Sequence, residues 1–144
     1  MLAVISLAVS TKILYTCSKS LSLCYNILND KSNAFDELNL LLVKSDIKCK
    51  IAKTHLFIRD INVDQLPPYI NLSIKDLDDS IISINQILEQ LIVQQNYTKT
   101  LYFSKWRQVD ISTLLNSLEV AINVFNIRFD DMLNFYRLNG FKNN

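Results

Sequence analysis

Side chains that often carry catalysis or bind metals are scarce in this chain. It holds one histidine, His55, and three cysteines, Cys17, Cys24 and Cys49. A single histidine excludes most histidine-based catalysis and any multi-histidine metal site. The cysteines lack the C-x-x-C spacing of a zinc site, and a chain with one glycine has no glycine-rich loop to hold a phosphate. We therefore expect no catalytic site, no metal and no cofactor.

The cysteines and the acidic residues are also poorly placed to act together. Cys17 and Cys24 are seven residues apart, which on one helix is about 10 Å of rise and too far for a disulfide bond. A low, odd cysteine count suits a reducing compartment. Acidic residues that are adjacent in sequence do not face each other on a helix. We expect three such pairs on the solvated surface: Asp36-Glu37, Asp78-Asp79 and Asp130-Asp131.

The elements that would position these side chains are helices. Hydrophobic residues make up 49% of the 144 residues, with one glycine and two prolines. Turn-rich β folds need many more of both. The length suits one domain with a sizeable core, so we expect an all-α bundle of four to five long helices over residues 1–144. The net charge of +1 gives no sign of a nucleic-acid partner.

Two helices are expected in the first half of the chain. Apolar residues recur at steps of three and four from about residue 2 to 28, and again from about 34 to 59. The second segment carries lysines in its middle, which form either a solvated face or a contact with acidic lipid head groups. These candidate head-group residues are Lys44, Lys48, Lys50 and Lys53.

Two more helices are expected in the second half. Ser73 followed three residues later by Asp76 matches a capping signal, so a helix is predicted to begin at Ser73 after a proline-containing loop. The segment 97–108 is predicted to be irregular. Three roles are open for its aromatic and basic residues: they cover the end of the core, stack on nucleic-acid bases or lie at a membrane interface.

The last helix has a predicted signal at each end. Asp110 is its predicted N-cap, and Gly140 is placed to end it.

The first predicted helix is unusually poor in charge, with only Lys12 and Lys19 before residue 30. No basic residue precedes its apolar start, unlike a secretory signal. A helix over residues 1–29 would be about 43 Å long, against about 30 Å of bilayer hydrocarbon. The segment is therefore either a core helix or a switch element that can leave the helical bundle and enter a lipid bilayer. Its candidate membrane-inserting residues are Leu2, Val4, Ile5, Leu7, Val9 and Ile13.

Three stretches together resemble a known family. The apolar start leads to Cys17, residues 45–58 resemble a Lys-Leu-Asp-Ile-Ala-Lys segment, and residues 103–110 precede a leucine-rich helix. This order is similar to that of the HeLo domain of fungal incompatibility and immune-type proteins. The positions that match its motifs are Asp46, Ile47, Ala52, Leu56, Lys105 and Asp110. The chain departs from the family at Ile58-Arg59, where the family has Trp-Gly, and Trp106 is out of register with the family's tryptophan.

The resemblance implies a non-enzymatic executioner of regulated cell death, similar in outline to the four-helix domain of the mixed-lineage kinase-like pseudokinase. It implies a cytoplasmic chain that responds to an upstream protein activator, forms a homo-oligomer and moves to the plasma membrane. There the N-terminal helix would leave the bundle and enter membrane lipid in a pore-forming step. The residues alone leave two alternatives open. One is a soluble interaction module that binds a partner helix in a groove, and the other is a bundle that binds a small molecule.

Overall fold

The structure, a computed structural model, describes residues 2–30, 35–61, 66–100 and 110–138, with the backbone alone at residues 2–8 and 99. These residues form five α-helices and no strand, which confirms the all-α prediction. The helices are α1 (Leu2–Leu28), α2 (Asp36–Lys44), α3 (Ile47–Asp60), α4 (Pro68–Thr100) and α5 (Ser112–Leu138).

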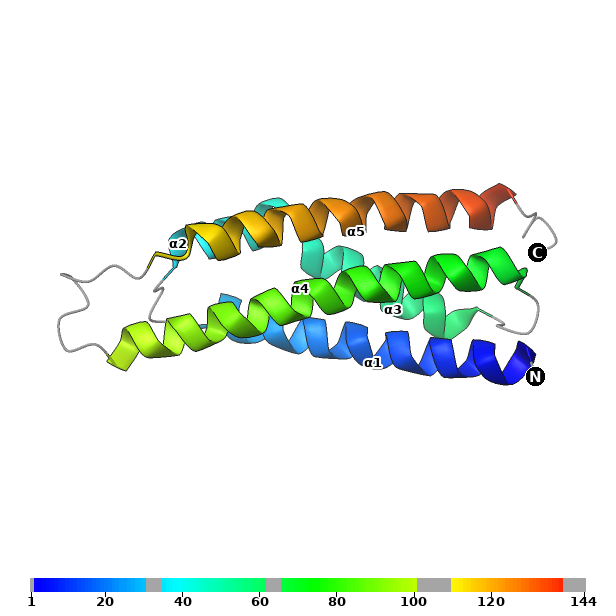
Figure 1. Ribbon diagram of the computed structural model, residues 1–144, viewed down its shortest axis with the longest axis horizontal. Coiled ribbons are helices and arrows are strands. Elements are labelled where there is room, and N and C mark those ends of the chain that lie inside the picture. The colour runs from blue at the N-terminus through cyan, green and yellow to red at the C-terminus, as the bar shows by residue number, and fades with distance from the viewer. Residues whose placement is uncertain (1, 31–34, 62–65, 101–109, 139–144) are drawn as a thin grey trace.

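The helices lie side by side: α1 and α4 run in one direction, and α2, α3 and α5 run in the other (Figure 1). α1 packs against α3 and α4, and α4 also packs against α5. α5 meets α3 through side chains: Lys50 Nζ donates to Asn126 Oδ1 at 2.9 Å, and the rings of Phe57 and Tyr136 pack edge to face. The helices therefore form a ring in the order α1, α4, α5, α3, in which α1 and α4 are parallel neighbours (Figure 1).

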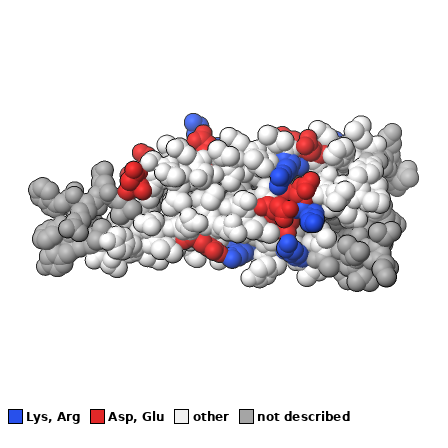
Figure 2. Space-filling view, viewed as in Figure 1, with Lys and Arg blue, Asp and Glu red and all other residues white. Residues whose placement is uncertain are grey.

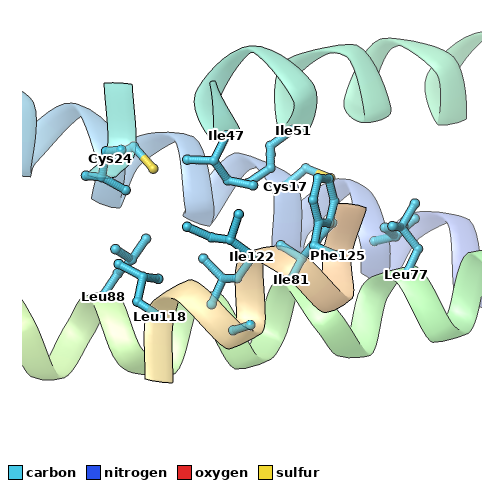
Figure 3. Packing of buried hydrophobic residues seen from close by; sticks show 14 of the residues in the cluster. Cys17, Cys24, Ile47, Ile51, Leu77, Ile81, Leu88, Leu118, Ile122 and Phe125 are labelled. Atoms are coloured by element: carbon cyan, nitrogen blue, oxygen red, sulfur yellow. The ribbon is translucent and has the colours of Figure 1, made fainter. Parts of the chain in front are cut away.

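The core lies along the axis of this ring, and each long helix contributes one face to it. Cys17, Ile51, Ile81 and Phe125 come from four different helices and point inward together (Figure 3). The stripe of α4 predicted from its 3-4 spacing is buried along its whole length, as expected for a helix that packs on two neighbours. Its members are Ile74, Leu77, Ile81, Ile84, Leu88 and Leu91.

The single helix predicted from about residue 34 to 59 is wrong, because α2 ends at Lys44 and α3 begins at Ile47. The break falls at Asp46, whose φ of 54° is left-handed. Aspartate tolerates this conformation better than most residues, since its short polar side chain can bond locally. Leu42 and Ile47 are both buried although they are five residues apart, so the break interrupts the 3-4 spacing of the core positions. The predicted apolar row through Cys49 and Leu56 instead falls on exposed positions of α3.

The predicted start of α4 is also wrong. The helix begins at Pro68, and Ser73 lies inside its second turn, where its hydroxyl donates to the Tyr69 carbonyl at 3.1 Å. Proline suits the first position of a helix because it lacks an N–H that would be unpaired there. α4 also continues to Thr100, through residues that the sequence predicted to be irregular.

The predicted cap at Asp110 is confirmed. Its Oδ1 accepts hydrogen bonds from the Ser112 hydroxyl at 2.5 Å and the Ser112 backbone N–H at 2.9 Å. These bonds favour the carboxylate and so lower the pKa of Asp110. The basic and aromatic residues 101–109 and the predicted terminator Gly140 lie outside the described residues.

Candidate functional site

The candidate membrane-inserting residues occupy the first half of α1. Leu2, Val4, Ile5 and Leu7 lie on its helical backbone, although their side chains lie outside the described set. Val9 is half-buried and packs against the core, and Ile13 is fully buried within it. Ile13 could therefore meet lipid only after α1 had moved away from its neighbours.

The four candidate lysines do not share one face. Lys48 and Lys50 are two residues apart on α3, which turns them about 200° from each other. Lys48 Nζ lies 6.0 Å above the Tyr25 ring of α1, whereas Lys50 is held by Asn126 of α5 on the other side. Lys44 and Lys53 are exposed on the outer side of α2 and α3. These two are therefore the best placed of the four for a head-group contact.

A row of polar contacts joins α1 to α4, and the sequence did not reveal it. Lys12 Nζ lies 3.5 Å from Asp78 Oδ2, and Lys19 Nζ lies 2.5 Å from Glu89 Oε1. Between these ion pairs, the side-chain amide of Asn85 donates to the Thr16 carbonyl at 3.2 Å. We call these three contacts the polar seam.

The expected solvated position of Asp78 is wrong. Its side chain is 3% exposed, because Asp78 lies within the buried stripe of α4 and faces α1. Lys12 and Lys19 are seven residues apart and their partners Asp78 and Glu89 are eleven apart, so the members of each pair fall on one helix face after two and three turns. Two charges on one face of an otherwise uncharged helix are the signal from which the polar seam could have been inferred.

The cysteines differ sharply in their surroundings. Burial raises the pKa of the Cys17 thiol to about 12, with a smaller contribution from the nearby Asp78 carboxylate. Burial also raises the pKa of Cys24 to about 11, against a small opposing effect of Lys48. Cys49 is exposed on α3. Since the thiolate is the reactive form, the two buried cysteines are chemically inert in the folded protein.

We expect iodoacetamide at pH 8 to modify the native protein once, at Cys49. Modification of Cys17 and Cys24 should be much slower than that of Cys49 and should require α1 to open or the chain to unfold, because each is both inaccessible and protonated in the closed bundle. Mass spectrometry after a timed quench would count the adducts, and the same reaction in denaturant should give all three. Rapid native labelling of Cys17 would contradict the buried position of that face of α1.

An apolar stripe is exposed on α5. Val120, Val124 and Ile127 follow one another at steps of four and three, on the side of the helix opposite Phe125. The exposed fraction of the side chain reaches 62% at Val120 and 63% at Ile127. Apolar residues gathered on one exposed face are typical of an interaction surface.

Two further findings bear on the site. Of the helices that the structure describes, none is both long enough and apolar enough to span a bilayer. Nor do three His, Cys, Asp or Glu residues within the described ranges come together as they would around a metal ion. Comparisons of the chain with protein-family models, curated proteins and solved structures found no match.

Proposed function

We propose that this chain is a non-enzymatic HeLo-like domain that forms oligomers and inserts its N-terminal helix into membranes to execute regulated cell death. In this proposal the domain waits in the cytoplasm as a closed bundle until an upstream protein activates it. α1 then leaves the bundle and enters the plasma membrane. Its first three turns provide the apolar face, and Lys44 and Lys53 contact anionic head groups.

The charge distribution on α1 is the observation that carries this proposal. The 27-residue helix holds two charges, Lys12 and Lys19, and both form ion pairs with α4. Contact with α4 therefore satisfies the charged groups of α1 in the closed bundle. Once these pairs open, the ten residues from Leu2 to Thr11 form a helical segment without any charge.

The hydroxyl group of Thr16 has a partner within α1 that a lipid environment would not remove. A polar group in hydrocarbon must find its partner within the protein. Thr16 Oγ1 already donates to the Lys12 carbonyl at 2.9 Å, one turn earlier on the same helix. Serine and threonine bonds of this kind travel with the helix, so they lower the cost of moving α1 out of the bundle.

We expect the full chain to release dye from liposomes that contain anionic lipid, and a chain without residues 1–10 to release little or none. The shortened chain must keep its helical circular dichroism signal and its cooperative unfolding transition, so that lost release reports on the segment and not on the fold. Equal release by both chains would contradict a role for the start of α1. No release by either chain, with both folded, would contradict membrane disruption itself.

A charge-reversal variant tests the head-group contact separately. Lys44→Glu with Lys53→Glu should weaken binding to anionic liposomes by about tenfold or more, since each basic residue near such a surface contributes about 1 kcal/mol. Both lysines are exposed, so the fold should be unaffected. The matched control is Lys75→Glu, an exposed lysine on α4. Equal weakening by the control would show that net charge, and not this site, governs binding. A liposome co-sedimentation series would supply the affinities.

The exposed stripe on α5 favours a second candidate, a soluble module that binds an amphipathic partner helix. Such a helix would pack its apolar side along Val120, Val124 and Ile127. The two functions differ in their target. In this second case the protein would bind no liposomes, and Ile127→Asp would abolish partner binding without unfolding the bundle.

A further inference from the structure

We propose that the polar seam makes α1 the part of the bundle that opens first, with the buried amide of Asn85 at its weakest point. The inference concerns the bundle by itself. It goes beyond the proposed function because it requires neither a membrane nor a partner.

The side chains that α1 buries are small and often polar. Among the described side chains of α1, Thr16, Cys17, Ser20 and Cys24 lie on its inner face between Ile13 and Ile27, and leucines at its edges also pack against the core. α5 instead buries larger apolar groups such as Phe125 and Met132 at the centre of its inner face. Because hydrophobic stabilisation scales with the apolar area removed from water, these four positions of α1 stabilise the closed bundle less than larger apolar side chains would.

The interface between α1 and α4 also holds buried atoms that lack partners. Within the described part of the chain, Asp78 Oδ1, Asn85 Oδ1 and Ser20 Oγ make no hydrogen bond, and the first two belong to residues of the polar seam. A buried polar atom without a partner opposes closure, since water would solvate it when the helices separate. All three atoms belong to α1 or to the face of α4 that meets it. The cost of closing the bundle is thus concentrated at this one interface.

The paired atoms of the polar seam set the register of α1. The ion pairs of Lys12 and Lys19 flank the hydrogen bond from Asn85, so three contacts fix about two turns of α1 along about three turns of α4. Buried polar contacts are better known for specifying one arrangement than for stabilising it. The interface therefore selects a single closed position of α1 without holding it tightly.

Native-state hydrogen exchange on the full chain, without lipid, tests this inference. Amides of α1 from Ser10 to Leu28 should exchange about tenfold or more faster than the slowest amides of α4 and α5, through openings smaller than global unfolding. Two variants should slow the exchange of α1 by about tenfold: Asn85→Leu and Ser20→Ala. Each removes an atom whose burial opposes closure, and tenfold corresponds to about 1.4 kcal/mol.

Matched controls separate this effect from helix propensity and added apolar surface. Gln86→Leu changes an exposed neighbour of Asn85, and Ser18→Ala changes an exposed serine on α1. If the amides of α1 in the unaltered chain exchanged at the same rate as those of α4 and α5, the inference would be overturned. It would also be overturned if Asn85→Leu and Ser20→Ala slowed the exchange of α1 no more than their controls do. Ser20→Ala adds no volume, so it remains informative if Asn85→Leu overpacks the core. These readouts stand whether or not the protein releases dye.

Discussion

Replacing Phe125 with alanine is expected to lower the free energy of unfolding by about 3–5 kcal/mol. Phe125 is fully buried where the four sides of the bundle meet, and its ring stacks on that of Phe129 with 5.8 Å between centroids (Figure 3). Truncation removes apolar area from the core and leaves a cavity that rigid neighbours on other helices cannot fill. A domain of this kind is stable by only about 5–15 kcal/mol, so the loss would be a large part of the total.

Urea unfolding followed by circular dichroism measures this effect. The matched variant is Val120→Ala on the same helix, where the side chain is exposed and the expected change is about 0.5 kcal/mol or less. A Phe125→Ala protein as stable as Val120→Ala would show that α5 does not pack against the other helices in the manner described.

Proline in place of Ser83 is expected to cost about 3 kcal/mol or more. Ser83 lies near the middle of the 33-residue α4, its side chain is exposed, and its hydroxyl donates to the Asp79 carbonyl at 3.2 Å. Proline would remove the backbone N–H that bonds to the same carbonyl, and its ring would clash with that oxygen. Because α4 packs against both α1 and α5, a kink there would disturb two interfaces at once.

Ser83→Ala is the control for this substitution. It removes the same hydroxyl bond but keeps the backbone N–H, so stability should stay the same or rise by about 0.5 kcal/mol. The two variants are compared by the midpoint of thermal unfolding. If proline at this position were tolerated as well as alanine, α4 would not be one continuous helix.

Charged side chains on the surface also connect the helices. Figure 2 shows one large group of neighbouring acidic and basic side chains on the visible face and smaller charged groups elsewhere on it. Arg128 Nη1 of α5 donates to the Asp76 carbonyl of α4 at 2.7 Å. A cationic side chain thus joins α4 to α5 at the surface, outside a continuous apolar core. The charged contacts between α4 and α1 instead reach the buried side chain of Asp78.

Local sequence determined the helices themselves. Steps of three and four between apolar residues predicted α1 and α5 close to their observed bounds and the middle of α4, because such spacing puts one apolar face on a helix. The cap at Asp110 was equally predictable, since its hydrogen bond reaches only two residues along the chain. Scarcity of glycine and proline was enough to exclude a turn-rich fold.

Only the tertiary structure showed the break at Asp46 and the burial of Asp78. Leu42 and Ile47 are five residues apart, which would turn them about 140° from each other on one straight helix, and the left-handed residue between them allows both to be buried. The burial of Asp78 depends on which helix lies beside α4, and the order of helices around a ring is not encoded in the periodicity of any one of them. The sequence alone therefore determined which faces are apolar, whereas the arrangement of neighbours determined which polar residues those faces enclose.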